Sequence, residues 1–348
     1  MFNMIKLSYN LFKLKFSNAS KPVMLSLYIT NLCNLRCSYC FICDESIPKE
    51  IRSAEFSLDE IKKIIDDFYS LGTRMIFLLG GEPLVHKEFG NIMEYIHHKG
   101  IVVHVLTNGT LIDKKINDLK FADGICVSLD GVGETNDCHR GKGVYEKAIT
   151  NIEKAKTAGL KCRIHSTLTR ANLYKFEELV YVAKKLGVMI TISPAHYVDA
   201  GDDGGLIIND DEYRAFWERY LVLKKQGYPI GNSVFTIQTM IDWPLGYQKT
   251  MMKNTKLPDG YRRPISCVNA KYYAGLSADG TLHYCLKPGM PVGPNIKDVG
   301  VHKAWDTLVK TRPNCFACAS TNAIEYSLAS YMHSDAIWNA LKFQFLIR

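Results

Sequence analysis

Several features that define whole classes of protein are missing from the sequence. It has no run of 18 apolar residues, which excludes a membrane-spanning helix. Its N-terminal stretch has neither an unbroken apolar core nor a small-residue cleavage site, so it does not resemble a secretory signal peptide. There is no internal repeat, no low-complexity tract and no nucleic-acid-binding motif to accompany the modest excess of 43 basic over 35 acidic residues. We therefore expect a globular, cytoplasmic protein without a nucleic-acid partner.

The two ends of the chain are basic and amphipathic. Residues 1–23 precede the first expected strand, and residues 321–348 are expected to form a C-terminal helix. Amphipathic helices of this kind usually pack their apolar face on the body of a protein. Contact with a membrane surface is the alternative interpretation of the same pattern.

Between these ends, short apolar runs alternate with amphipathic stretches. Helices are expected over 57–72, 143–159 and 172–187, because each has a 3.6-residue apolar period and ends on glycine. Near-continuous apolar runs indicate strands of a parallel sheet that is covered by helices. With right-handed crossovers, residues 24–227 predict an α/β fold, a partial (β/α)6 TIM-like barrel. The six expected strands are 24–30, 74–80, 101–107, 124–130, 161–168 and 188–195.

Residues 228–320 follow a different pattern and are expected to form a small α+β domain. Proline and glycine interrupt the segment, and the turn SADG (277–280) predicts a β-hairpin. A small domain with a weak core is usually held together by a metal centre. Its candidate ligands are Cys267, Cys285, Cys315 and Cys318.

The first expected strand is followed by a loop rich in cysteine. Cys33, Cys37 and Cys40 have the spacing Cys-x3-Cys-x2-Cys, and in a parallel barrel the active face lies at the carboxyl ends of the strands. Three thiolates can bind three irons of a [4Fe–4S] cluster and leave the fourth iron open. A zinc site is the alternative, and it would need Cys43 as a fourth ligand.

This loop and the strand ends after it resemble the radical SAM superfamily. Beyond the three cysteines, the resemblance rests on LLGGEPL (78–84), VLTNGT (105–110), VSLDG (127–131) and HRGKG (139–143), and it covers about residues 24–200. The last two motifs are similar to those of the SPASM and Twitch branches. Carried over to this chain, the residues implied to bind S-adenosylmethionine (SAM) are Tyr39, Gly80, Gly81, Glu82, Pro83, Asn108, Ser128, Asp130 and Arg140.

The resemblance also implies an activity. Such enzymes cleave SAM reductively to a 5′-deoxyadenosyl radical, which abstracts hydrogen from substrate, and they take electrons from a flavodoxin- or ferredoxin-type donor. The four C-terminal cysteines resemble those of a Twitch domain with one auxiliary [4Fe–4S] cluster. Because every iron of that cluster would have a protein ligand, it would exchange an electron rather than bind substrate. Structural zinc is the alternative for this set.

The substrate class stays open between two readings. Oxidation of a small molecule is favoured because only about 23 residues precede the first strand, too few for the leader-binding domain that peptide maturases often carry. Crosslinking or epimerisation of a ribosomal peptide is the alternative, and a non-catalytic Fe–S or zinc protein is a third. Cys43, Cys126, Cys138 and Cys162 are expected to be buried structural residues. Weak candidates for catalytic groups are His104, Cys126, His165, His196 and Tyr197.

Overall fold

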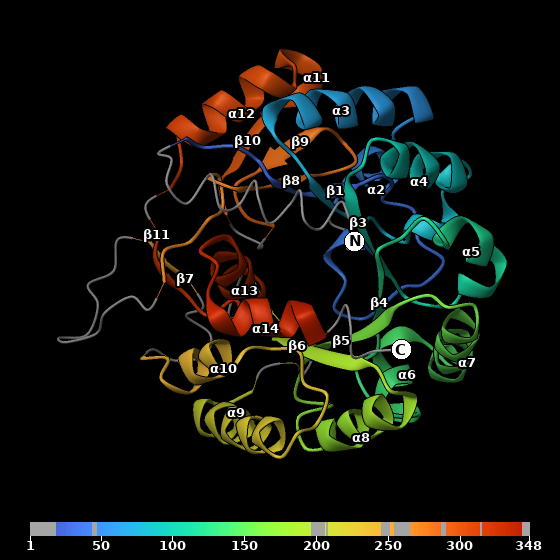
Figure 1. Ribbon diagram of the computed structural model, residues 1–348, viewed down its shortest axis with the longest axis vertical. Helices are drawn as coiled ribbons and strands as arrows, with labels where there is room; N and C mark the ends of the chain where they lie inside the picture. The colour runs from blue at the N-terminus through green and yellow to red at the C-terminus, as the bar shows by residue number, and fades with distance from the viewer. Residues whose placement is uncertain are drawn as a thin grey trace.

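The computed structural model describes residues 19–43, 47–195, 206, 208–244, 251–253, 265–286, 290–313 and 315–342. In this part of the chain, one curved nine-stranded sheet has the order β10-β9-β8-β1-β2-β3-β4-β5-β6, and β7 pairs with β11 in a separate ribbon. Helices surround the convex side of the large sheet, while α13 lies on its concave side (Figure 1). None of the helices in the described ranges is long and apolar enough to cross a bilayer.

The six expected barrel strands are all present. They pair in parallel and in chain order, with a register that brings their carboxyl ends to one rim. This confirms the partial barrel that the alternating sequence predicts. The strands are β1 (Met24–Tyr28), β2 (Met75–Leu79), β3 (Val102–Thr107), β4 (Gly124–Ser128), β5 (Cys162–Leu168) and β6 (Met189–Pro194).

The helices between these strands begin and end where the sequence signals them. Ser57 and Glu60 form a capping box at the start of the first long helix, and Gly72 ends it with a φ of 116°. The described helices of this half are η1 (Phe41–Cys43), α2 (Lys49–Arg52), α3 (Leu58–Leu71), η2 (Pro83–Val85), α4 (Phe89–His98), α5 (Ile112–Leu119), α6 (Glu134–Arg140), α7 (Val144–Thr157), α8 (Phe176–Leu186), α9 (Asp210–Lys225) and α10 (Val234–Ile241).

The two faces of the sheet differ in burial. On β5, Cys162, Ile164, Ser166 and Leu168 are fully buried, whereas the residues between them are half-buried. Because side chains alternate along a strand, the first set faces the helices and the second faces the inside of the barrel. The inner set on this strand is Arg163, His165 and Thr167.

The predicted hairpin is also present, and it extends the barrel sheet. Strand β8 (Tyr273–Leu276) pairs antiparallel with β9 (Thr281–His283) and parallel with β1. The hydroxyl of Tyr273 donates a hydrogen bond of 2.8 Å to Ser26 on β1, both residues being buried. The remaining elements here are β7 (Met251–Lys253), β10 (Val292–Asn295), α11 (Ile296–Val299), α12 (Val301–Lys310) and β11 (Cys315–Cys318).

The C-terminal region differs from the single helix expected over 321–348. The structure has two helices, α13 (Thr321–Ser330) and α14 (Ser334–Leu341), which a turn containing Met332 separates. Met332 has a φ of 54°, a left-handed conformation that interrupts a right-handed helix. Helix α13 contacts the inside of the barrel through Tyr326, which stacks on Phe77 with ring centroids 5.1 Å apart.

Candidate functional site

The cysteine loop follows β1 and is fixed to the end of β2. The amide of Gly81 donates to the carbonyl of Thr30 at 2.8 Å, and the amide of Glu82 donates to that of Leu32 at 2.9 Å. Within the loop, the amide of Cys40 donates to the carbonyl of Cys37 at 3.0 Å. Cys33, Cys37 and Cys40 are all half-buried. The loop therefore presents three partly accessible thiols at the carboxyl rim of the barrel.

Two glycines allow this close approach. A Cβ atom on Gly80 would lie 2.3 Å from the carbonyl oxygen of Thr30, and one on Gly81 would lie 2.4 Å from that of Leu32. Both distances are far inside van der Waals contact, and each clash is with backbone rather than a flexible side chain. Gly80 and Gly81 therefore have a structural role in seating the loop. Pro83, the residue after Glu82, is buried at the start of η2.

Glu82 is buried beneath the loop at the ends of β2 and β3. Its carboxylate accepts hydrogen bonds from the hydroxyl of Thr107 and the amide of Asn108, both at 2.7 Å, and from the amide of Leu84 at 3.1 Å. Burial raises the pKa of Glu82 to about 7, although these donors oppose the shift. A buried acid of this kind fits a ligand that brings a positive charge to it.

Asn108 connects the end of β3 to the cysteine loop. Its side-chain amide donates to Asn34 at 2.9 Å, and the amide of Asn34 donates to the hydroxyl of Thr110, also at 2.9 Å. Asn34 lies directly after Cys33. The start of the loop is thus bound to β3 as well as to β2.

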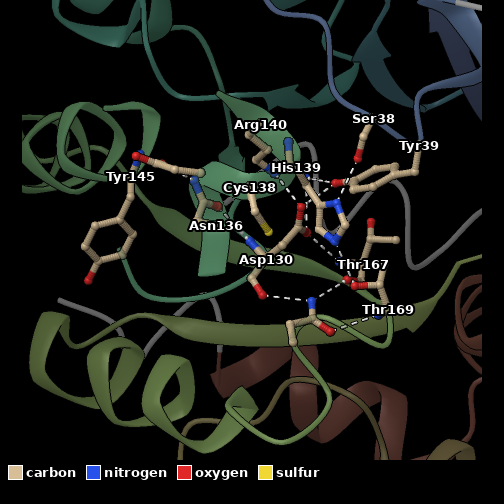
Figure 2. Close-up of polar contacts among 12 residues, drawn as sticks. Ser38, Tyr39, Asp130, Asn136, Cys138, His139, Arg140, Tyr145, Thr167 and Thr169 are labelled. Carbon is tan, nitrogen blue, oxygen red and sulfur yellow. Dashed lines mark hydrogen bonds and ion pairs between the residues drawn. The ribbon is translucent and has the colours of Figure 1, made fainter. Parts of the chain in front are cut away.

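A second network holds the other end of the loop (Figure 2). Arg140 donates to Asp130 through Nε at 2.7 Å and through Nη2 at 3.2 Å, and it also donates to the hydroxyl of Tyr39 at 2.6 Å. Tyr39 in turn donates to Asp130, which also accepts from the amide of Thr167 at 2.9 Å. Arg140 is 8% exposed and Asp130 only 1%. Burial opposes the charge of Arg140, but the Asp130 carboxylate raises the pKa of Arg140 above its usual range.

Ser128 completes the residues that the sequence places at this rim. It is half-buried at the carboxyl end of β4 and is opposite His165 in the pairing of β4 with β5. The three cysteines and the nine residues that the sequence selects thus lie on or after the carboxyl ends of β1 to β4, or on α6, which is bonded to them.

The arrangement of thiols on the cysteine loop can be compared with the ligand geometry that zinc and [4Fe–4S] clusters require. Among the described residues, no three His, Cys, Asp or Glu side chains converge closely enough to bind a single ion. A zinc ion draws all of its thiolates to one point, whereas a [4Fe–4S] cluster binds each cysteine through a different iron. Three thiols on one loop suit a cluster that takes each cysteine through a different iron. The side chain of Cys43 lies outside the described residues.

The second cysteine set comes from separate segments. Cys267 precedes the hairpin, Cys285 follows it, and Cys315 is on β11; all three are half-buried. Arg312 donates to the carbonyl of Cys267 at 2.6 Å. Cys318 is the last residue of β11, and its side chain lies outside the described residues. The Arg312 contact thus brings the segment just before β11 next to Cys267.

The weak catalytic candidates are not equivalent. Burial lowers the pKa of His104 to about 3 and that of His165 to about 4, so both rings are neutral near pH 7 and are poor bases. His165 lies between the hydroxyls of Thr191 and Ser193, each 2.9 Å from a ring nitrogen. His196 and Tyr197 lie outside the described residues.

The other cysteines mostly agree with the expectation of burial. Cys126 and Cys162 are buried in the sheet. Cys138 is exposed, which corrects that expectation. It lies on α6, where the buried face consists of Thr135, Asn136, His139 and Arg140, so Cys138 falls on the solvent side of the helix.

Sequence reasoning missed the residues that support this rim. Asn34, Ser38, Asn136, His139 and Thr169 all contribute hydrogen bonds to the networks around the loop. Asn34 and Ser38 lie inside the cysteine loop, His139 opens the motif HRGKG, and Asn136 lies three residues before that motif, but no pattern in the sequence assigned a role to any of them. Nothing in the sequence indicated Thr169.

Comparison with known proteins points to one family. Residues 27–180 match the model of the Radical SAM superfamily. The chain is 32% identical over 254 residues to Fe-coproporphyrin III synthase of Methanosarcina barkeri, which covers 69% of this chain and 61% of that protein. It is 29% identical to the mycofactocin maturase MftC of Mycolicibacterium smegmatis, covering 62% of this chain and 55% of the maturase.

A solved structure has the same fold. The crystal structure of Streptococcus suis SuiB bound to S-adenosylmethionine superposes with a TM-score of 0.63 at 17% identity, covering 85% of this chain and 68% of SuiB. The matched part of this chain spans less than two thirds of the length of the two curated relatives above, 61% and 55%. At 17% identity, the similarity to SuiB shows the fold alone.

Proposed function

The chain contains a radical SAM domain over residues 27–180, and from this premise we propose that it is an enzyme that cleaves SAM reductively and abstracts hydrogen from a substrate. One observation carries the proposal. The three-cysteine loop, the buried Glu82 and the buried Arg140–Asp130 pair lie at the carboxyl ends of the parallel strands β1, β2 and β4. This rim is where parallel barrels place their reactive groups.

In this proposal, Cys33, Cys37 and Cys40 bind three irons of a [4Fe–4S] cluster and leave the fourth for SAM. When bound together, the cluster and SAM supply a 5′-deoxyadenosyl radical that takes a hydrogen atom from the substrate. The chain supplies the binding groups and excludes water. Two residues have the charges needed to complement the amino and carboxylate groups of SAM: Glu82 and Arg140.

The local contacts support these roles. A guanidinium has five N–H donors, and the described contacts of Arg140 use three, which leaves two for a ligand carboxylate. Asp130 is occupied by Arg140, Tyr39 and the amide of Thr167, so we assign it the orientation of Arg140. Glu82, with its raised pKa, becomes fully charged once an ammonium group lies beside it.

We further propose that Cys267, Cys285, Cys315 and Cys318 bind one auxiliary [4Fe–4S] cluster. Its role would be to accept the electron that the substrate radical loses as a proton leaves, which makes the net reaction an oxidation. A flavodoxin- or ferredoxin-type protein would supply the electron for SAM cleavage. The substrate we favour is a small molecule, and residues 24–227, 228–320 and 321–348 are the proposed domain divisions.

Anaerobic reconstitution tests this proposal. Two clusters require about eight irons per chain, and only about four would remove the auxiliary assignment. Incubation of the reconstituted protein with SAM and dithionite is expected to release 5′-deoxyadenosine. A protein that holds both clusters and releases none would contradict the enzymatic function.

A second candidate is modification of a ribosomal peptide. It is favoured by similarity to a protein named as a maturase, MftC. The two substrate classes are distinguished by which molecule the reconstituted protein alters. Incubation in D2O with candidate peptides would give a deuterium-labelled or crosslinked peptide by mass spectrometry. Failure with peptides, together with turnover of a small polar substrate, would favour the first reading.

A further inference from the structure

One contact of the cysteine loop has no place in the function proposed so far. Ser38 lies between Cys37 and Cys40, and its amide donates to the carbonyl of His139 at 2.9 Å. Its hydroxyl lies 2.8 Å from Nδ1 of the same residue. Ser38 is exposed, whereas His139 is only 9% exposed. The loop is thus attached, through an exposed serine, to a ring that is fixed inside the protein.

The other side of the His139 ring faces β5. Its Nε2 lies 3.0 Å from the hydroxyl of Thr169, a fully buried residue just after that strand. The amide of Thr169 donates to Asn172 at 2.8 Å, which fixes the threonine itself. A neutral imidazole has one donor and one acceptor, and a hydroxyl can be either, so both ring nitrogens are satisfied. The ring bridges the loop and the barrel wall (Figure 2).

This bridge is separate from the Arg140 network, although the two are adjacent. Arg140 holds Tyr39, and His139 holds Ser38, so two successive residues of α6 hold two successive residues of the loop. The His139 ring also packs edge-on against Tyr39, with centroids 5.4 Å apart. The segment Ser38–Tyr39 is the connection between Cys37 and Cys40, so its placement determines where those two thiols point.

We propose that His139 is a positioning residue, which ties Ser38 to β5 through Thr169 and thereby sets the geometry of Cys37 and Cys40. The inference rests on the proposed function, because it assumes that these thiols bind a cluster. A ring that only filled space could be replaced by phenylalanine without consequence. A ring that acts through its two hydrogen bonds could not.

The test measures how fast the cluster is lost. Wild type, His139→Phe, His139→Gln and Ser38→Ala are reconstituted anaerobically, and iron transfer to the chelator bathophenanthroline is followed by absorbance. The loss of one or two neutral hydrogen bonds predicts release from the three-cysteine site about fivefold to tenfold faster in His139→Phe and Ser38→Ala. His139→Gln, which keeps a donor and an acceptor, is expected to restore much of the wild-type rate. The double variant is expected to be no faster than the faster single variant.

Several results separate the possible outcomes. Ser38→Ala keeps the test valid if His139→Phe fails to fold, because Ser38 is exposed. Cys138→Ser, a change on the exposed face of the same helix, is the matched control and should release iron at the wild-type rate. Wild-type release from both Ser38→Ala and His139→Phe would overturn the positioning role while leaving the proposed function intact. Absence of a cluster from the wild-type loop would instead overturn the proposed function, and this inference with it.

Discussion

The two cysteine groups of this chain are built in different ways. Cys33, Cys37 and Cys40 lie on one short loop whose neighbours are hydrogen-bonded to the ends of β2, to β3 and to α6. Cys267, Cys285 and Cys315 come from segments separated by a hairpin and two helices. The first group therefore depends on how one loop is held by the barrel, whereas the metal centre proposed for the second group would join residues from separate segments.

The largest expected effect concerns chemistry at the first group. Each of Cys33→Ala, Cys37→Ala and Cys40→Ala is expected to abolish 5′-deoxyadenosine formation, because each removes one iron ligand of the proposed cluster. Cys285→Ala is expected to leave SAM cleavage measurable while stopping substrate turnover. Release of 5′-deoxyadenosine is measured by chromatography, and Cys43→Ala and Cys138→Ala are the controls. Loss of cleavage in Cys43→Ala would show four ligands where we propose three.

Metal removal is expected to change the mobility of the backbone differently around the two cysteine groups, which we call the first region (Cys33, Cys37 and Cys40) and the second region (Cys267, Cys285 and Cys315). Chelation is expected to accelerate amide hydrogen exchange in residues 265–270, 284–286 and 315–320, because these lie outside the hairpin strands that pair with the barrel and would be joined by the proposed metal. Residues 33–40 should change much less, since their hydrogen bonds to the barrel persist. Equal acceleration in both regions would mean that the cysteine loop is not held by the protein alone.

The next largest effect is a loss of folding stability when the buried ion pair between Arg140 and Asp130 is broken. Arg140→Leu leaves Asp130 buried without its charged partner, and breaking such a pair typically costs about 3–5 kcal/mol. We expect this loss in urea unfolding of the apo-protein, together with loss of SAM binding by calorimetry. The matched control is Arg219→Leu, which removes an exposed ion pair with Glu177 and should cost about 1 kcal/mol or less.

The raised pKa of Glu82 makes the first region sensitive to pH. Its folded-state pKa of about 7 lies above the unfolded value of 4.5, so the folded protein holds the proton longer than the unfolded one. The stability that the protonated Glu82 carboxyl contributes is thus lost as pH rises from about 4.5 to 7. A pKa shift of this size corresponds to roughly 3 kcal/mol of unfolding free energy. Urea unfolding of the apo-protein at several pH values measures it.

The control for this pH dependence is Glu82→Gln, which cannot ionise. The difference in unfolding free energy between wild type and Glu82→Gln should grow in favour of the variant over that pH range. Saturating SAM is expected to reduce the difference, because its ammonium group favours the charged carboxylate. A pH-independent difference would show that folding leaves the pKa of Glu82 unchanged.

The sequence predicts the first region far better than the second, for a physical reason. Barrel strands carry local apolar runs, and Gly72 and Gly187 mark helix ends through their own backbone conformation. The parallel pairing of β8 with β1 joins residues almost 250 positions apart in the chain, and no local pattern encodes it. The same holds for the bridge from Ser38 through His139 to Thr169, which only the folded barrel brings together.

The smallest expected loss of stability tests the pairing of β8 with β1, which joins the hairpin to the barrel. Tyr273→Phe removes the hydroxyl that donates to Ser26, and with it a buried hydrogen bond between β8 and β1. We expect a loss of about 1 kcal/mol in urea unfolding, because the ring itself still stacks on Tyr326. Tyr273→Ala also removes that stacking and should cost about 3–5 kcal/mol. If both variants unfold in one transition, the hairpin and the barrel form one cooperative unit; an early separate transition of the hairpin would show that β8 joins the sheet without sharing its stability.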